Sequence, residues 1–250
     1  MSQRDWRDYI GEFHHAKPGI TEDVLGRCCV DGATPYEWLG ANLEGTGITI
    51  DLACGSAPMQ PIIGPGWLGV DRSEAELAAA RRKARTAPLC RADAGALPFR
   101  DHGADAVLCC MGLMVIPSIE ATLRELARVA HRDALIAVLV PAARPLTVRD
   151  RLRYARLLLA LRITSFQYPN AEVVRDPALT LRRSGLTVID DASKRFEFTM
   201  TDEATADLFV ESLYLPHTPR RRVDAAQQVV RRWLGTELGV PLRRLIAKPV

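Results

Sequence analysis

The sequence has few lysines, few aromatic residues and no long apolar run. Lysine supplies only four of its 33 cationic residues, and Phe, Trp and Tyr together make up 6% of its 250 residues. The longest apolar stretch outside the expected strands, 154–163, is interrupted by arginines and is shorter than the ~20 residues of a membrane span. The first residues are charged and lack the apolar segment of a secretory signal. These absences predict a cytoplasmic protein with no membrane partner.

The six cysteines contain no C-x-x-C spacing that would indicate a zinc site. They include two adjacent pairs, 28–29 and 109–110, and we expect reduced thiols that pack as small apolar groups rather than bind metal. The net charge is +3, and the arginines form short, scattered clusters instead of one basic tract. A nucleic-acid partner usually requires a stronger basic footprint, so these clusters favour solvated surfaces.

Short apolar runs alternate with helical patterns between residues 48 and 140. Five runs have the length and composition of strands inside a parallel sheet: 48–53, 67–71, 88–93, 104–110 and 134–140. Helical patterns at 73–85 and 118–130 separate some of them, and Ser73 and Glu76 have the spacing of a capping box. Right-handed crossovers then predict an α/β fold with a doubly wound sheet.

The segments on either side of this region add helices and two more strands. We expect an N-terminal helical cap over 1–47, with helices at 5–13, 21–29 and 35–43, followed by one α/β domain over 48–250. Within that domain, helical insertions are expected at about 146–163 and 201–236, and strands at 186–200 and 241–250.

The turn "DLACGSAP" at residues 51–58 follows the first strand, where a doubly wound fold binds its ligand. A dinucleotide site requires G-x-G-x-x-G so that the backbone can approach the pyrophosphate. The corresponding positions here are Ala53, Gly55 and Pro58. Asp51 would also repel a pyrophosphate, whereas its carboxylate suits a cationic group. The turn therefore argues against a dinucleotide and for a ligand with a positive charge.

This turn resembles the first motif of the class I S-adenosylmethionine-dependent methyltransferases, which is an acid followed by three alternating small residues. Asp51, Ala53, Gly55 and Ala57 match the motif, with alanine at two of the three glycine positions. Residues 90–110 are similar to the family's "AD…LPF…FD.V" signature. The resemblance covers residues 48–140. It implies a Rossmann-like methyltransferase sheet, mostly parallel with an antiparallel last strand, and S-adenosylmethionine as the cofactor.

The resemblance also implies roles for acids at three successive strand ends. Asp71 would accept hydrogen bonds from the ribose hydroxyls. Asp93 would accept one from the adenine amino group, with the Ala94 N–H near a ring nitrogen. The end of the fourth strand would offer backbone carbonyls to the methionine portion. The implied cofactor-binding set is Asp51, Ala53, Cys54, Gly55, Ser56, Asp71, Arg72, Asp93, Ala94, Cys110 and Met111.

Candidates for the acceptor side lie in the helical caps, because the strands of the resembled family hold the cofactor. The segment 9–15 is rich in aromatic and titratable groups, and 214–217 follows a predicted helix in the later insertion. A solvent-exposed helix end and a plain turn are the alternative interpretations of these two segments. The family often has a histidine shortly after the fourth strand, where this chain has Met114. The catalytic candidates are His14, His15 and His217, and the substrate-binding candidates are Tyr9, Phe13, Met114 and Tyr214.

The predicted function is methyl transfer from S-adenosylmethionine to an oxygen, nitrogen or carbon of a small molecule in specialised biosynthesis, by a monomer or homodimer. A hydroxyl or carbon acceptor gains from a general base, whereas an amine can react without one. Three alternatives stay open: an RNA base methyltransferase, a family member that binds the cofactor without transferring methyl, and a metalloid methyltransferase that uses Cys28, Cys29, Cys109 and Cys110.

Overall fold

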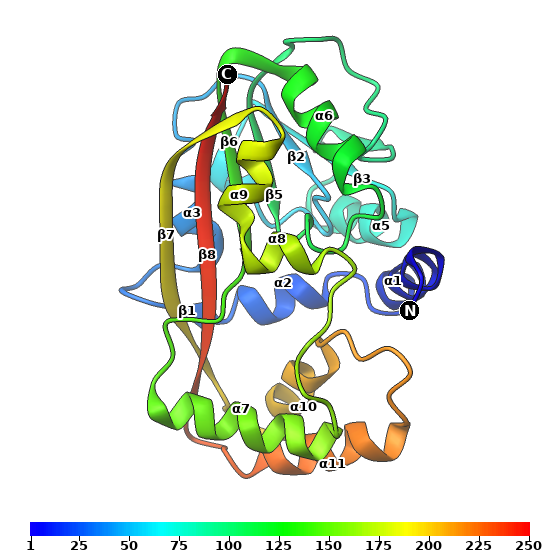
Figure 1. Ribbon diagram of the computed structural model, residues 1–250, viewed down its shortest axis with the longest axis vertical. Coiled ribbons are helices and arrows are strands. Elements are labelled where there is room, and N and C mark those ends of the chain that lie inside the picture. The colour runs from blue at the N-terminus through cyan, green and yellow to red at the C-terminus, as the bar shows by residue number, and fades with distance from the viewer.

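The computed structural model describes residues 1–250 and contains one eight-stranded sheet (Figure 1). The strand order across the sheet is β1-β7-β8-β6-β5-β2-β3-β4. The strands have the bounds β1 Cys28–Cys29, β2 Thr49–Leu52, β3 Trp67–Asp71, β4 Leu89–Arg91, β5 Ala104–Cys110, β6 Ala130–Pro141, β7 Leu186–Thr199 and β8 Glu237–Pro249.

The pairing of these strands confirms the predicted Rossmann-like sheet, which is mostly parallel. Strands β2 to β6 are parallel to one another, whereas β8 is antiparallel to both β6 and β7. The last strand is therefore antiparallel, as predicted. It inserts between β6 and β7 instead of lying at an edge.

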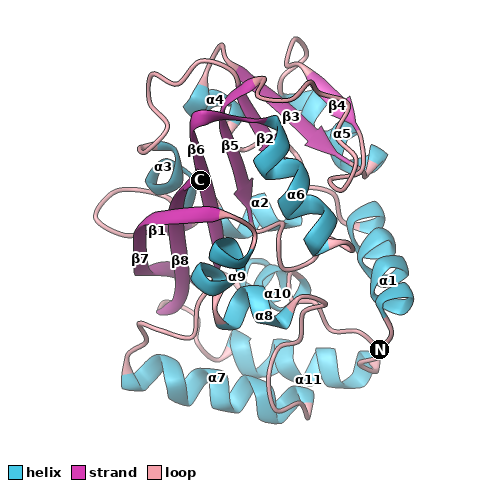
Figure 2. Cartoon of the chain, turned by 45° about the horizontal axis from the view of Figure 1, so that its top comes forward, coloured by secondary structure: helices cyan, strands magenta, loops and turns pink.

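Eleven helices accompany the sheet (Figure 2), and none of them is both long and apolar enough to cross a membrane. Their bounds are α1 Gln3–Ala16, α2 Ile20–Leu25, α3 Pro35–Gly40, α4 Gln60–Ile63, α5 Glu74–Lys83, α6 Ile119–Val129, α7 Val148–Leu161, α8 Ala171–Arg175, α9 Pro177–Arg183, α10 Glu203–Glu211 and α11 Arg220–Arg231.

The sheet has an apolar core on each face, because successive side chains of a strand point to opposite sides. In β5, Ala106 and Leu108 join one buried cluster, while Val107 and Cys109 join the other. The strands of the parallel region are thus covered on both faces, which is why they read as continuous apolar runs.

The helix predicted over 21–29 is wrong at its end. Helix α2 stops at Leu25, and Cys28 and Cys29 form the short strand β1, which pairs with Phe198 and Glu197 of β7. A two-residue strand has no periodicity of its own, so only its distant partner defines it. The partner lies about 170 residues further along the chain, beyond the reach of a local pattern.

Strands β7 and β8 extend beyond the rest of the sheet to a layer formed by α7, α10 and α11 (Figure 1). Asp150 joins this layer to the sheet. Its buried carboxylate accepts the Thr147 N–H and so completes a capping box at the start of α7. It also accepts two hydrogen bonds from Arg195 of β7, at 2.7 and 3.1 Å, and one from the Gly239 N–H of β8, at 2.8 Å. Burial opposes ionisation, but these donors outweigh it and hold the pKa of Asp150 well below its usual value.

We expect Asp150→Asn to lower the free energy of unfolding by about 3 kcal/mol at pH 7, because it leaves the half-buried Arg195 guanidinium without its main partner. A carboxylate with a lowered pKa stabilises the fold above pH 4, and that contribution fades as the pH falls through the folded-state pKa. The difference between variant and wild type should therefore shrink below about pH 4 in urea titrations. Asp224→Asn, which removes an exposed i,i+4 pair with Arg220, is the control and should cost about 0.5 kcal/mol or less. Equal losses for the two variants would contradict this account.

Candidate active site at the carboxyl edge of the sheet

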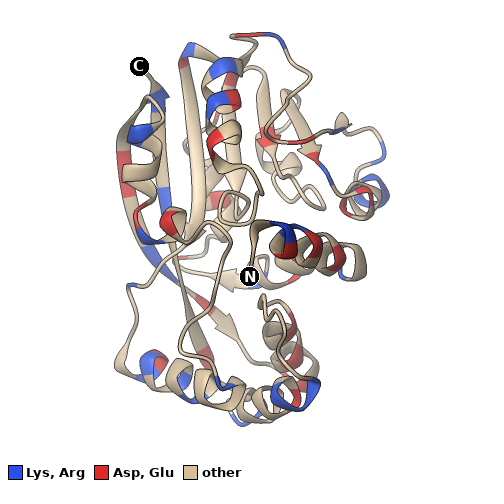
Figure 3. Cartoon of the chain, turned by 45° about the vertical axis from the view of Figure 1, so that its right-hand side comes forward, with Lys and Arg blue, Asp and Glu red and all other residues tan.

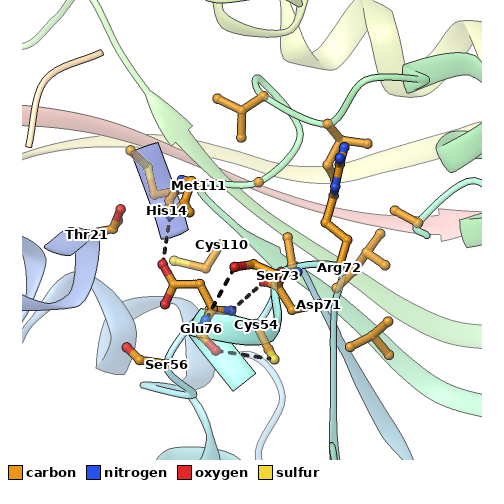
Figure 4. A pocket seen from close by; sticks show the side chains of 18 of the residues that line it. His14, Thr21, Cys54, Ser56, Asp71, Arg72, Ser73, Glu76, Cys110 and Met111 are labelled. Carbon is orange, nitrogen blue, oxygen red and sulfur yellow. Dashed lines mark hydrogen bonds and ion pairs between the residues drawn. The ribbon is translucent and has the colours of Figure 1, made fainter. Parts of the chain in front are cut away.

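The carboxyl ends of β2, β3, β4 and β5 open into one cavity of about 350 Å³ (Figure 4), called here the edge cavity. Parallel strands bring these ends to the same edge of the sheet. All eleven predicted cofactor-binding residues line the edge cavity, including the three acids Asp51, Asp71 and Asp93. The structure thus brings the predicted set together.

The turn after β2 has an unusual backbone conformation. Ala53, Gly55 and Ala57 have φ values of 56°, 54° and 66°, which lie in the left-handed region that favours glycine. Two of the three positions nevertheless carry alanine, at a cost of about 1–2 kcal/mol each. The conformation explains why the resembled motif has glycine at these positions, and it shows that alanine can adopt the same turn.

Asp71 fastens this turn to the end of β3. Its carboxylate accepts the Gly55 N–H at 2.9 Å and the Ser73 N–H at 2.8 Å. Burial raises the pKa of Asp71, although both backbone donors lower it. The side chain is therefore fixed in place at the wall of the edge cavity, and each of its oxygens keeps a lone pair for a further hydrogen bond.

Asp51 is the most deeply buried acid of the site, with 1% of its surface exposed. One carboxylate oxygen accepts the Trp67 indole N–H at 2.9 Å, and the other has no hydrogen-bond partner. Burial raises the pKa of Asp51 to about 8. A buried carboxylate oxygen without a donor is costly, and a positively charged ligand group would relieve that cost.

Asp93 lies at the outer end of the edge cavity, where about half of its side chain is exposed. One of its oxygens accepts the Gly95 N–H at 2.9 Å, and the neighbouring Ala94 N–H makes no hydrogen bond within the chain. Around the whole edge cavity the six acids outnumber the four basic side chains: the acids are Glu22, Asp51, Asp71, Glu74, Glu76 and Asp93, and the basic residues are His14, His15, Arg72 and Arg91. This excess favours a cation.

Glu76 closes the edge cavity by holding the N-terminal helix over it. Its side chain is almost fully buried, and one of its oxygens lies 2.8 Å from His14 Nδ1 (Figure 4). The other oxygen accepts the Gly19 N–H at 2.9 Å. The predicted capping box is therefore only half correct. Ser73 accepts the Glu76 N–H and caps α5, but the Glu76 carboxylate bonds to the N-terminal segment instead of returning to Ser73.

His14 continues this connection toward a second cavity. Its Nε2 lies 2.9 Å from the hydroxyl oxygen of Tyr214, which follows α10. The second cavity has a volume of about 270 Å³, and it shares Thr21, Met111 and Tyr214 with the edge cavity. Met114, a predicted substrate-binding residue, lines only the second cavity.

The other acceptor-side candidates are placed less directly. His15 lines the edge cavity but is exposed, and its side chain makes no hydrogen bond, while His217 is exposed and lines neither cavity. Tyr9 and Phe13 also line neither. The Tyr9 hydroxyl accepts the Leu215 N–H at 2.8 Å, and the Phe13 ring packs edge-on against Tyr214. These two residues position Tyr214, so the structure gives no support to their direct contact with a substrate or to an acid–base role for His217.

Of the four adjacent cysteines, only Cys110 lines the edge cavity. Burial raises the pKa of both Cys28 and Cys109 to about 12, which keeps them as thiols at neutral pH. No group of three or more His, Cys, Asp and Glu side chains has the arrangement of a metal site.

Sequence reasoning missed Glu76 as a residue of the site. Its spacing from Ser73 satisfies a capping box, so the local pattern already explained its presence. No feature of the neighbouring sequence distinguishes a glutamate whose carboxylate caps its own helix from one that bonds to a segment about 60 residues away. Thr21, at the junction of the two cavities, lies in an ordinary helix and gave no signal.

Comparisons with known proteins agree with the geometry. Residues 50–138 match the family model described as a methyltransferase domain, while a search among curated proteins finds no match. A structure assigned as a type II methyltransferase from Anaeromyxobacter dehalogenans is 18% identical, with a TM-score of 0.61, and the alignment covers 86% of this chain and 94% of that one.

Two further structures align over nearly the whole chain. One is a protein assigned as a methyltransferase in complex with the Haloferax volcanii activator Trm112 (16% identity, TM-score 0.59, 97% and 96% covered). The other is the [4+2]-cyclase SpnF (17% identity, TM-score 0.58, 96% and 95% covered). Residues 50–138 thus match a methyltransferase domain, and the chain as a whole has the fold of structures assigned as methyltransferases.

Proposed function

We propose that this protein transfers a methyl group from S-adenosylmethionine to a small-molecule acceptor in a biosynthetic pathway. The observation that carries the proposal is the convergence of Asp51, Asp71 and Asp93 on one cavity in which acids outnumber basic side chains. A sulfonium and an ammonium group would both be attracted to such a cavity. In this proposal residues 1–47 form a cap over a methyltransferase domain of residues 48–250.

The residues present fit this cofactor. Asp71 would hold the ribose hydroxyls, Asp93 and the free Ala94 N–H would hold the adenine, and the unpartnered oxygen of Asp51 would face the cationic end. The cofactor supplies an electrophilic methyl group on a positively charged sulfur. The chain itself would orient the acceptor beside the methyl group and take up the acceptor's proton. His14 is the catalytic candidate, because it lines the edge cavity and lies within hydrogen-bonding distance of Tyr214 at the junction of the two cavities.

An RNA substrate receives little support from the charges. Basic residues are scattered over the molecule in Figure 3, and many of the clustered arginines are paired with acids. Examples are Arg81 with Glu74, Arg231 with Asp207, and Arg243 with Asp191. A phosphate backbone requires a run of unpaired cations. The metalloid alternative needs thiolates, and burial disfavours these at Cys28 and Cys109.

A second candidate function is catalysis of another reaction with the cofactor bound but not consumed. The observation that favours it is the likeness of nearly the whole chain to a structure described as a [4+2]-cyclase. The two candidates differ in one product, because only methyl transfer releases S-adenosylhomocysteine.

We expect Asp71→Asn to weaken the binding of S-adenosylmethionine by about tenfold or more in calorimetry. The amide keeps the shape of the carboxylate but loses a charge-assisted hydrogen bond worth about 1.5–3 kcal/mol. Asp133→Asn removes an exposed acid at the opposite end of the sheet and should bind like wild type. Equal affinities for wild type and Asp71→Asn would argue against the ribose contact and against the proposed function.

Asp51→Asn should have opposite effects on binding and on stability. The folded-state pKa of about 8 lies above the unfolded value of 3.8, so the folded protein keeps Asp51 protonated while the unfolded chain ionises it, and the free energy of unfolding falls as the pH rises from about 4 to 8. The amide removes this penalty. Its stability advantage should grow by up to about 1.4 kcal/mol per pH unit in that window, measured by urea unfolding. At pH 8 the same variant should bind S-adenosylmethionine more weakly. A stability difference independent of pH would contradict the buried, unpaired state of this carboxyl group.

A further inference from the structure

The second cavity is uncharged throughout, and it is called here the acceptor cavity. None of its 20 lining residues is Asp, Glu, Lys, Arg or His, and 15 of them are hydrophobic. Its walls come from α2, α7, α10, the segment 166–168, the end of β6 and residues 240–242 of β8. Transfer of an ion from water into such a cavity is costly because no side chain of opposite charge compensates it. The edge cavity, with its six acids, has the opposite character.

The two cavities meet at Thr21, Met111 and Tyr214. Away from this junction, the acceptor cavity shares five lining residues with a wider surface hollow: Ala142, Ala143, Phe166, Gln167 and Tyr168. A molecule could therefore enter the acceptor cavity from that side without passing through the edge cavity. Its inner end would then lie against Tyr214.

A hydrogen-bonded relay ends at this junction. It consists of Glu76, His14 and Tyr214, with separations of 2.8 Å between the carboxylate and Nδ1 and 2.9 Å between Nε2 and the hydroxyl oxygen. When Glu76 accepts the Nδ1–H, Nε2 is left as an acceptor for the Tyr214 hydroxyl proton. The side chain of His14 is 19% exposed, whereas that of Glu76 is 4% exposed. Protons can therefore leave the relay at His14.

Tyr214 is suited to pass a proton on rather than to hold a charge. Burial raises the pKa of its hydroxyl well above the usual value, so a free tyrosinate is disfavoured. A proton that arrives on its oxygen is matched by the departure of its own proton to His14. Tyr168 adds a second hydroxyl to the acceptor cavity, and it makes no hydrogen bond within the chain.

We infer that the acceptor cavity binds an uncharged, mainly apolar molecule whose hydroxyl group lies against Tyr214, and that the Glu76–His14–Tyr214 relay takes the proton of this hydroxyl during methyl transfer. This inference rests on the proposed function and names its acceptor atom as oxygen. His14 and Tyr214 act on the acceptor proton, whereas Glu76 is a positioning residue that acts through His14.

The step balances without a further reactant. The acceptor oxygen forms a bond to the methyl carbon of S-adenosylmethionine as the methyl–sulfur bond breaks, and the electron pair of the broken bond stays on sulfur. The acceptor proton moves to the Tyr214 oxygen while the Tyr214 proton moves to His14 Nε2. The imidazolium faces the Glu76 carboxylate and then releases its proton to solvent.

The class of acceptor can be tested by binding, with S-adenosylhomocysteine present at saturation so that no transfer occurs. We expect 2-naphthol to bind at least about tenfold more tightly than 2-naphthoate and 2-naphthylmethylammonium, which have the same ring but a negative or positive charge. Leu213→Trp, which fills the cavity, should abolish 2-naphthol binding, whereas Leu152→Trp on the exposed face of α7 should not. Equal binding of the charged probes, or no binding of 2-naphthol, would overturn the inference.

The relay can be tested by comparing 2-naphthol with naphthalene, which lacks only the hydroxyl. In the wild type, 2-naphthol should bind at least about tenfold more tightly. Tyr214→Phe should remove this preference, and Glu76→Gln and His14→Gln should reduce it severalfold while leaving naphthalene binding unchanged. A merely structural role for these residues would weaken both probes equally, and that result would overturn the relay.

The same samples separate the two proposals. Calorimetric binding of S-adenosylhomocysteine and the melting temperature are measured for every variant. Wild-type protein that binds S-adenosylhomocysteine but shows no preference for the hydroxyl probe would overturn the acceptor assignment and leave the proposed function standing. Wild-type protein that fails to bind S-adenosylhomocysteine would overturn the proposed function itself.

Discussion

A single buried carboxylate, that of Glu76, joins the N-terminal helix to α5. It bonds to His14 and to the Gly19 N–H, and so it holds α1 and the start of α2 against α5. A buried carboxylate is stable only when donors satisfy it, and these donors come entirely from the N-terminal segment and its histidine. The wall of the edge cavity, the placement of His14 and the hydrogen bond to Tyr214 all depend on this contact.

The parallel sheet imposes the second constraint on the site. Strands that run in one direction end at one edge, so acids placed at the ends of β2, β3 and β4 must meet even though they are far apart in sequence. Each such strand is a short apolar run between turns, and this pattern allowed the strand to be predicted from the sequence. The five predicted strands of the region 48–140 each overlap an observed strand, and the end of β6 at Pro141 lies one residue from its predicted end.

What could not be predicted depends on contacts between distant segments. Strand β1 exists only through its pairing with β7, and the role of Glu76 exists only because α1 folds back over α5. Local rules explained both stretches in another way, as the end of a helix and as a capping box. The histidines show the same limit. His14 and His15 are adjacent in sequence, and the sequence predicted both as catalytic candidates. Only His14 lies within hydrogen-bonding distance of Glu76 and Tyr214.

The contrast between the two cavities fits the charge changes of the proposed reaction. The donor begins with a positive sulfonium and ends as a neutral thioether, so the acids of the edge cavity attract the donor more strongly than its product. The hydroxyl acceptor begins neutral and ends neutral, because it loses a proton as it gains the methyl group. An uncharged cavity therefore suits the acceptor both before and after transfer. Only the proton needs a separate route, and the relay that ends at the partly exposed His14 provides one.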